Sequence, residues 1–271
     1  MPDLVVTGAS RGIGRALALS LAGCGQRLVV VARDRARLDE VVAGVASRGG
    51  AALAVPGDLG SLAGARDLGG RLSELLEPGA TLVHNAGLWP ARRVLTPDGL
   101  EQAFVVNHLG PFAMQRALLE GHKLRRIMTV SAALIALGRV DARRTPRGDD
   151  FSRLRTYCST KLWFALSTRE VARSHPEIDV VALHPGVVRT DLGVQPGWRG
   201  WLLSLGKHAL ESPESCAARL ARILGRERWS PPGAACWLMK ESDRPWPARA
   251  RDEAAQREVT EATAALLSAQ P

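Results

Sequence analysis

Tyr157 and Lys161 lie four residues apart in a stretch whose apolar pattern predicts a helix over Thr156–Ser174. Residues at this spacing share one face of a helix, so the two side chains can meet. A tyrosine with its ordinary pKa of about 10 is a poor acid or base at neutral pH, but a neighbouring ammonium group stabilises the phenolate and lowers that pKa. The pair is therefore predicted to exchange a proton with the oxygen of a carbonyl or alcohol. The alternative is a structural tyrosine beside a lysine that reaches solvent.

A glycine-rich turn, Gly8-Ala9-Ser10-Arg11-Gly12-Ile13-Gly14, follows a strand-like run at Leu4–Val6 and precedes helical periodicity at Arg15–Ala22. Glycine permits a sharp turn and lets the backbone approach a pyrophosphate. The helix that follows offers free N–H groups and a partial positive charge to the phosphates. The position of the glycines between the first strand and the first helix predicts a dinucleotide-binding turn.

The end of the second strand candidate, Arg27–Ala32, indicates which dinucleotide is bound. Enzymes that use NAD usually place an acidic residue there to hold the ribose 2′-hydroxyl. This sequence has Arg33 instead, and a second arginine, Arg11, lies inside the glycine turn. Two guanidinium groups favour a 2′-phosphate, so NADP(H) is the predicted cofactor. Asp34, one position later, is the feature that would favour NAD.

Short β-rich runs alternate with helix-like segments along the chain. Further strands are expected at Ala51–Val55, Ala80–His84, Arg126–Val130, Asp179–Leu183 and Ala234–Leu238. Helices are expected over Leu62–Leu76, Gly99–Leu119, Thr156–Ser174 and Glu253–Leu267. Seven βα repeats with continuous apolar strands predict a single Rossmann-type, doubly wound α/β domain over residues 1–271, with an approximately seven-stranded parallel sheet flanked by helices.

Three segments interrupt the alternation of strands and helices. The charged residues 139–150 are predicted to form an exposed insertion, and residues 190–215, rich in Gly and Trp, a substrate lid. Residues 247–268 are expected to form a helical extension.

Composition and charge argue against several classes of protein. The net charge of +9 comes from 36 Lys and Arg against 27 Asp and Glu, but the arginines are scattered, which indicates solvated faces and a phosphate site instead of a nucleic-acid surface. No apolar run approaches the roughly 20 residues of a membrane span, and no signal peptide is expected. Four widely spaced cysteines predict reduced thiols without a metal site. A cytoplasmic protein is the expectation.

Six motifs resemble, in order and spacing, those of the short-chain dehydrogenase/reductase family, over about residues 3–240. They are the glycine turn with Thr7, Asp58-Leu59, Asn85-Ala86-Gly87, Asn107, Tyr157-Cys158-Ser159-Thr160-Lys161 and Pro185-Gly186-Val187-Val188-Arg189-Thr190. The stretch from Asn107 to Phe112 and the insertion before Tyr157 resemble the branch that contains retinol dehydrogenases and protochlorophyllide reductases.

The resemblance implies a role for each motif. Tyr157, Lys161 and Asn107 would be the catalytic residues: Tyr157 gives the proton, Lys161 also binds the nicotinamide ribose, and Asn107 holds a water that links Lys161 to solvent. Asp58 and Leu59 would contact the adenine, although Asp58 alone also fits a helix cap. The residues expected to bind the cofactor are Gly8, Ser10, Arg11, Gly12, Ile13, Gly14, Arg33, Asp58, Leu59, Asn85, Ala86, Gly87, Tyr157, Lys161, Pro185, Gly186, Val188 and Thr190.

The sequence departs from the family at the end of the fifth strand. The family's Val-Ser-Ser falls on Val130-Ser131-Ala132, which places Ala132 where the serine that binds the substrate oxygen is expected. A one-residue bulge could turn Ser131 inward, the substrate or another side chain could replace the hydroxyl, or the chemistry could be altered or lost. Losing one such donor typically costs about 2.7–4 kcal/mol of barrier.

The resemblance implies NADPH-dependent reduction of a ketone or aldehyde, or the reverse oxidation. Seven tryptophans stand out beside one tyrosine and four phenylalanines. Trp89 lies near the expected cleft. Trp198 and Trp201, in the expected lid, favour contact with a bulky lipophilic or polycyclic substrate; a lid that packs on its own body is the alternative. Reduction of a bulky ketone would fit bacterial secondary metabolism. Trp163 is expected to face the core or a subunit neighbour, and Trp229, Trp237 and Trp246 are expected to be structural.

Two further expectations concern subunit contacts and an alternative function. By analogy with the family, the helices around Gly99–Leu119 and Thr156–Ser174 would form the contact surface of a homodimer or homotetramer. The alternative function is a sensor or scaffold that keeps the NADP(H) site but has lost efficient turnover. Intact Tyr157, Lys161 and Asn107 argue against this alternative, and Ala132 argues for it.

Overall fold

Eight strands form one sheet in the computed structural model, which describes residues 2–189 and 211–269. The strands are β1 (Leu4–Thr7), β2 (Arg27–Ala32), β3 (Ala51–Pro56), β4 (Ala80–His84), β5 (Leu124–Val130), β6 (Asp179–His184), β7 (Ala235–Met239) and β8 (Ser242–Arg244). Their order is β3-β2-β1-β4-β5-β6-β7-β8. The first seven pair in parallel, and β8 runs antiparallel to β7. The predicted α/β fold is confirmed, with one short strand added at an edge.

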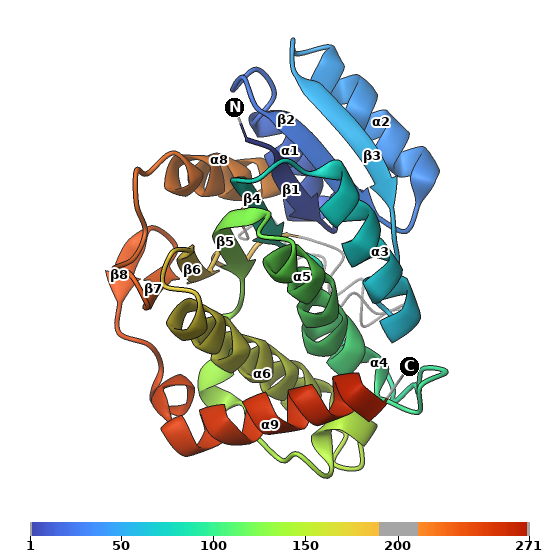
Figure 1. The fold of residues 1–271 in the computed structure, drawn as a ribbon, viewed down its shortest axis with the longest axis vertical. Helices are drawn as coiled ribbons and strands as arrows, with labels where there is room; N and C mark the ends of the chain where they lie inside the picture. Colours follow the sequence, from blue (N-terminus) through green and yellow to red (C-terminus); the bar gives the residue numbers. More distant parts are fainter. Residues whose placement is uncertain (1, 190–210, 270–271) are drawn as a thin grey trace.

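Helices cover both faces of this sheet (Figure 1). They are α1 (Gly12–Ser20), α2 (Arg35–Ala46), α3 (Leu62–Leu75), α4 (Gln102–Phe104), α5 (Gly110–Glu120), α6 (Arg153–Ser174), α8 (Pro213–Leu224) and α9 (Glu253–Ala269). One apolar core joins the sheet to α3, α5 and α6, and a second joins it to α1, α2 and α8. Continuous Val, Leu and Ile runs in the central strands serve both cores at once, which is why those strands show no polar alternation.

The expected helix over Gly99–Leu119 is divided into three parts. Glu101 caps α4 by accepting from Phe104 N at 2.8 Å, a π-helical turn follows at Val105–Leu109, and α5 begins at Gly110. A Cβ at Gly110 would overlap the carbonyl oxygen of Leu59, so the helix can approach that loop only with glycine at this position. The π-helical turn carries Asn107, and such turns often lie at functional sites.

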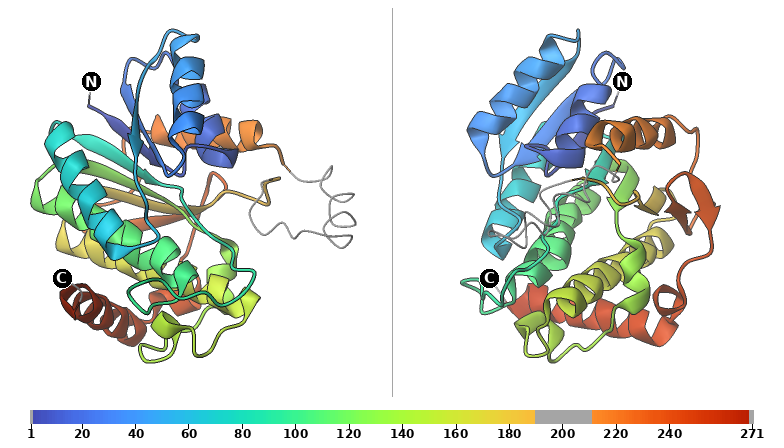
Figure 2. Two further views of the ribbon diagram at one scale, coloured as in Figure 1. Left: turned by 90° about the vertical axis from the view of Figure 1, so that its right-hand side faces the viewer. Right: turned by 180° about the vertical axis from the view of Figure 1, so that it is seen from behind.

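The α9 helix lies along α6 on the outer side of the α5–α6 layer (Figure 2). His108 Nε2 in the π-helical turn and Thr263 Oγ1 in α9 are hydrogen-bonded at 2.9 Å, although 155 positions separate them in the chain. Arg66 donates to Leu267 O at 2.5 Å, and Arg169 in α6 donates to Gln256 Oε1 in α9 at 3.0 Å. The helix is therefore fixed to three separate parts of the domain.

The segment 139–150 is more firmly packed than its composition suggests. Its arginines are exposed, but Thr145 and Pro146 are buried. Pro146 O accepts from Glu101 N at 2.8 Å, and Arg93 binds Arg147 O and the carboxylate of Asp149. Polar groups of neighbouring elements thus dock this charged insertion onto the domain.

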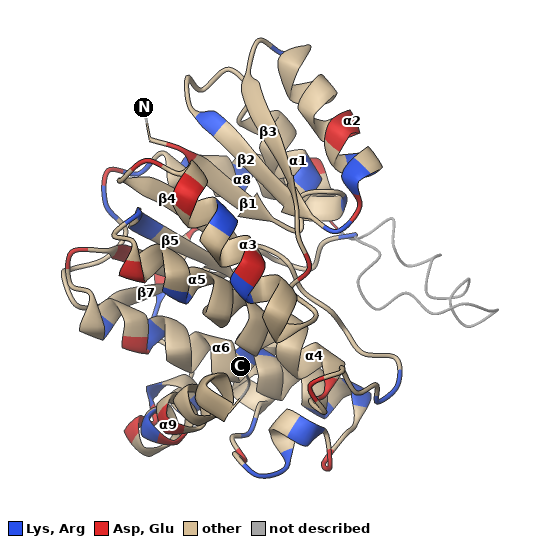
Figure 3. Ribbon diagram, turned by 45° about the vertical axis from the view of Figure 1, so that its right-hand side comes forward, with Lys and Arg blue, Asp and Glu red and all other residues tan. Residues whose placement is uncertain are grey.

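Lys and Arg are interspersed with Asp and Glu over most elements (Figure 3). Within residues 2–189 and 211–269, no helix combines the length and apolar character needed to cross a bilayer, and no three potential metal ligands cluster. Trp163 is fully buried, so it faces the core. Of the tryptophans expected to be structural, Trp229 lies under the guanidinium of Arg126, and Trp237 packs on Trp246.

Candidate active site

The glycine turn connects β1 to α1 with a backbone that only glycine adopts without strain. Gly8 and Gly12 have φ values of +68° and +54°. A Cβ at Gly14 would lie 2.5 Å from Asn85 Nδ2 and closer still to the carbonyl oxygen of Gly8. Within the described chain no side chain caps α1, so its first N–H groups stay free for an anion. This cradle fits the pyrophosphate of a dinucleotide.

The loop Asn85–Gly87, after β4, is tied to the glycine turn. Asn85 Nδ2 donates to Thr7 O at 2.9 Å and to Gly8 O at 3.3 Å, while Thr7 Oγ1 accepts from the backbone N of Asn85 and of Ala86. The strands β2 and β3 extend the sheet on one side of β1, and the chain then crosses to the other side at β4. Folds of this type bind their ligands at this switch point between β1 and β4. Two of the predicted cofactor motifs therefore meet at the expected place.

Arg11 and Arg33, the two arginines predicted to bind the 2′-phosphate, are both exposed. In the described ranges, neither Arg11 nor Arg33 forms an ion pair. Asp34 instead caps α2: its Oδ1 accepts from Arg37 N at 3.1 Å, and its Oδ2 pairs with the Arg37 side chain at 3.3 Å. The carboxylate that would favour NAD is thus engaged in its own helix, whereas the two guanidinium groups are available to a ligand.

The adenine-side residues adopt different environments. Asp58 is exposed, and its Oδ1 accepts from Gly60 N at 2.9 Å in a tight turn before α3. Leu59 is buried in the core under the start of α5. Ser61, not Asp58, caps α3, so Asp58 does not serve as the helix cap that was its alternative role.

Tyr157 and Lys161 lie near the start of α6, which Ser152 caps. Both side chains are buried, with 5% and 6% of their surfaces exposed. Lys161 Nζ donates to Val130 O at the end of β5, at 3.1 Å. A Cβ at Gly87 would lie 3.4 Å from Lys161 Nζ, so the amine faces the Asn85–Gly87 loop. The predicted catalytic pair and the cofactor loop are therefore neighbours.

Asn107 is a positioning residue in this arrangement. Its Oδ1 accepts from Leu88 N at 2.7 Å, and its Nδ2 donates to Leu88 O at 2.8 Å and to Thr160 Oγ1 at 3.0 Å. The amide thus joins the chain that follows Gly87 to the turn of α6 that carries Lys161. Its expected role in holding a water stays a prediction.

Burial dominates the titration of the predicted catalytic pair. It raises the pKa of Tyr157 to about 12, with the neighbouring Cys158 as a smaller cause, and it lowers the pKa of Lys161 to about 8. The expected lowering of the phenol pKa by Lys161 is not found: burial is the main cause of the shift, and Lys161 Nζ is bonded to Val130 O. At neutral pH the phenol keeps its proton, which is the form that a proton donor requires.

The Pro185–Gly186 turn, after β6, is anchored by two charged residues that the sequence did not single out. Arg219, in α8, donates to Pro185 O at 2.5 Å and pairs with Glu211. Glu211 also forms a β-bridge with Val188. Neither residue belongs to a family motif. Both lie 25 or more positions after Gly186, so no local sequence pattern connects them to this turn. Thr190, Trp198 and Trp201, with most of the expected lid, lie outside the described residues.

A family model for short chain dehydrogenases matches residues 3–196. The chain belongs to the short-chain dehydrogenase/reductase family. A protein from Streptomyces sp. (strain C5) named as a daunorubicin C-13 ketoreductase is 36% identical over 193 residues, which cover 70% of this chain and 67% of that protein. Retinol dehydrogenase 14 of Mus musculus is 34% identical over 210 residues, covering 70% of this chain and 62% of its own. The chain thus spans about three fifths to two thirds of the length of these relatives.

Solved structures agree with the fold. A short chain dehydrogenase from Burkholderia cenocepacia J2315 in complex with NADP superposes with a TM-score of 0.67 at 26% identity, over 88% of this chain and 96% of that chain. A protein from Mycobacterium paratuberculosis superposes with a TM-score of 0.78 at 23% identity, over 99% and 94% of the two chains. The latter likeness concerns the fold alone.

The backbone leads from β5 to Ala132 without a bulge. The register of β5 with β6 is unshifted from Arg126 to Val130, and Ser131 N continues it by donating to Leu183 O at 2.7 Å. Ala132 remains extended, with φ −147° and ψ 146°. No residue is therefore doubled in a way that would turn Ser131 toward the other face of the sheet. The hydroxyl of Ser131 is buried, and no described residue bonds to it.

Trp89 covers the candidate proton donor in this member of the short-chain dehydrogenase/reductase family. Its indole stacks on the ring of Tyr157, with ring centroids 4.2 Å apart and planes 18° apart. The sequence indicated that Trp89 borders the cleft. It did not indicate the contact with Tyr157, because Trp89 lies in the loop after β4 and Tyr157 lies in α6.

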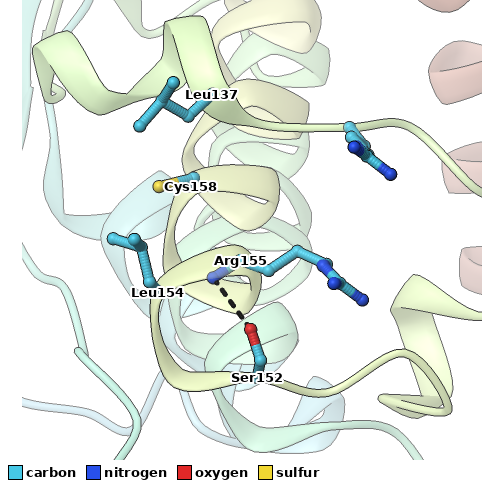
Figure 4. Close-up of a pocket in the computed structure, with 6 residues that line it drawn as sticks. Leu137, Ser152, Leu154, Arg155 and Cys158 are labelled. Atoms are coloured by element: carbon cyan, nitrogen blue, oxygen red, sulfur yellow. Dashed lines mark hydrogen bonds between the residues drawn. The ribbon is translucent and has the colours of Figure 1, made fainter.

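A cavity of about 250 Å³ opens on another flank of α6 (Figure 4). It is lined by Leu137, Arg139, Ser152, Leu154, Arg155 and Cys158. Neither Tyr157 nor Lys161 contributes to its wall, so this cavity is beside the candidate active site and not part of it.

Proposed function

We propose that the chain is an NADPH-dependent reductase of ketones or aldehydes, with Tyr157 as the proton donor. The observation that carries the proposal is the position of the buried Tyr157–Lys161 pair beside the Asn85–Gly87 loop, which is itself tied to the glycine turn. A proton donor and the cradle of a dinucleotide are thus held on neighbouring elements. The experiment is ketone-dependent oxidation of NADPH, with the Tyr157→Phe variant as its reference.

Each residue of the site has a defined task in this reaction. Glycine-turn N–H groups would hold the pyrophosphate, Arg11 and Arg33 the 2′-phosphate, and Lys161 the nicotinamide ribose. When bound, the cofactor supplies a hydride to the carbonyl carbon. Tyr157 gives its proton to the carbonyl oxygen, so that the C=O bond becomes a CH–OH group, and the phenolate is reprotonated from solvent. The reverse reaction oxidises an alcohol.

The substrate proposed is bulky and lipophilic. This is supported by the names of three relatives, which refer to daunorubicin, retinol and polyprenol. A role in bacterial secondary metabolism rests on the Streptomyces relative alone. The α9 helix packs against α6, one of the two helices proposed to form a subunit contact, so we favour a subunit arrangement that does not use that face.

Cofactor preference tests the roles of Arg11 and Arg33. NADPH is expected to bind at least about 10-fold more tightly than NADH, because a charge-assisted hydrogen bond contributes about 1.5–3 kcal/mol. Arg11→Ala and Arg33→Ala should each reduce this preference without changing NADH affinity. Arg35→Ala is the matched control, since this exposed arginine pairs with Asp39 inside α2. Equal affinities of the unmodified protein for the two cofactors, measured by calorimetry, would contradict the assignment.

A pair of substitutions tests whether Ala132 stands at the serine position. Ala132→Ser is expected to raise kcat/KM on simple ketones by about 10-fold or more, because it adds a donor for the carbonyl oxygen. Ser131→Ala should leave both activity and melting temperature nearly unchanged, since no described residue bonds to that hydroxyl. Loss of activity in Ser131→Ala would mean that Ser131 is the substrate-binding serine and that the alignment is wrong.

A second candidate function is favoured by Ala132 alone: an NADP(H)-binding sensor or scaffold with little turnover. It predicts tight NADPH binding together with no oxidation of NADPH by any ketone in a panel of small, polycyclic and long-chain compounds. Measurable turnover that depends on Tyr157 excludes it.

A further inference from the structure

The indole of Trp89 lies flat on the phenol ring of Tyr157. A plane angle of 18° and a centroid distance of 4.2 Å describe a stacked pair, not a chance edge contact. One face of the phenol is thereby closed to solvent and substrate, and only 5% of Tyr157 remains exposed. A substrate oxygen must then reach the hydroxyl at the edge of the ring.

The backbone beside Trp89 is fixed, so the stack is part of the architecture. Asn107 binds both the N–H and the carbonyl of Leu88, the residue before it. Pro90, the residue after it, is buried. The indole is thus presented from a held backbone, and it is itself only half-buried, so part of its surface remains available to a ligand.

We propose that Trp89 positions Tyr157 and determines specificity, by holding the phenol ring on one side and offering its remaining surface to a planar, conjugated ketone. This inference rests on the proposed function and specifies its substrate class. A flat ketone can pack against the exposed part of the indole beside Tyr157, whereas a compact aliphatic ketone gains little from that surface.

The stack also shields the phenol from water. Tyr157 is the single tyrosine of the sequence, so the ultraviolet absorbance of tyrosinate reports on this residue alone. Burial raises its pKa to about 12, and replacing the indole with a smaller side chain admits water to the phenol. In Trp89→Leu the midpoint of this titration should therefore fall toward the ordinary value of about 10. The measurement needs neither cofactor nor turnover.

The kinetic test compares two ketones of different shape, fluorenone and cyclohexanone, in NADPH-dependent reduction. Trp89→Leu should raise KM for fluorenone about fivefold to tenfold and leave KM for cyclohexanone within about twofold. Trp89→Phe, which keeps a flat ring, should restore most of the difference. Trp246→Phe is the matched control, because Trp246 packs on Trp237 away from this site.

The outcomes separate this inference from the function on which it rests. An unchanged tyrosinate midpoint in Trp89→Leu, or equal changes in KM for both ketones, would overturn the role of Trp89. If the unmodified protein reduces no ketone, the proposed function fails, while the tyrosinate titration still decides whether Trp89 shields Tyr157. Circular dichroism of each variant identifies any loss of folding. If Trp89→Leu does not fold, the KM values of Trp89→Phe for fluorenone and cyclohexanone decide the role of Trp89.

Discussion

Tyr157→Phe is expected to lower kcat/KM for ketone reduction by about 10²–10⁴-fold while NADPH affinity stays within about twofold. The substitution removes the proton donor and nothing else that the structure shows: the ring remains, so the stack with Trp89 persists. General acid catalysis typically contributes this range of rate. Since the phenol keeps its proton at neutral pH, the unmodified protein should work well in the reductive direction.

Initial rates of NADPH oxidation and calorimetric binding of NADPH measure the two quantities separately. Lys161→Met offers a useful comparison, because it should weaken cofactor binding as well as turnover. If Tyr157→Phe retains more than about a tenth of the activity, another group donates the proton and the assignment of Tyr157 is incorrect.

Gly14→Ala is expected to raise the dissociation constant for NADPH by about 100-fold or more. The added Cβ would lie 2.5 Å from Asn85 Nδ2 and closer still to the Gly8 carbonyl oxygen, so backbone or side chain must move. Either movement breaks the contact between the glycine turn and the Asn85 loop, which together form the cradle. A smaller change in affinity would be inconsistent with a rigid cradle at this turn.

Gly70→Ala is the control for this substitution. Gly70 lies in α3, and no atom comes within 4 Å of a Cβ built there. Alanine is favoured over glycine in a helix interior by up to about 1 kcal/mol, so this variant should be equal or higher in melting temperature and bind NADPH normally. Loss of NADPH binding in both variants would indicate general damage to the fold.

The sheet was predictable because its central strands are buried on both faces and so appear as unbroken apolar runs. The strand β8 (Ser242–Arg244) was not, since its three residues are polar and exposed and form no apolar pattern. The expected helix over Gly99–Leu119 contained the right residues, but apolar periodicity does not distinguish a π-helical turn from an α-helical one.

The candidate site was predictable in its motifs and not in its environment. The glycine turn, Tyr157 and Lys161 have signals in residue type and spacing. Two other features depend on tertiary packing between distant segments: the stack of Trp89 on Tyr157 and the hydrogen bond from Arg219 to Pro185 O. For the same reason the direction of the Tyr157 pKa was wrong: an i,i+4 spacing reveals a neighbouring charge, but not how much water the fold removes.

The attachment of α9 has a consequence for the order of events during protein synthesis. His108 is completely buried and bonded to Thr263, so this contact cannot form until more than 150 further residues have left the ribosome. At about 5–20 residues per second this takes roughly 8–30 seconds. Until α9 has emerged, the His108 contact in the π-helical turn and the face of α6 that α9 covers stay unpacked. During that interval these surfaces are open to chaperones, to proteases and to association with other unfinished copies.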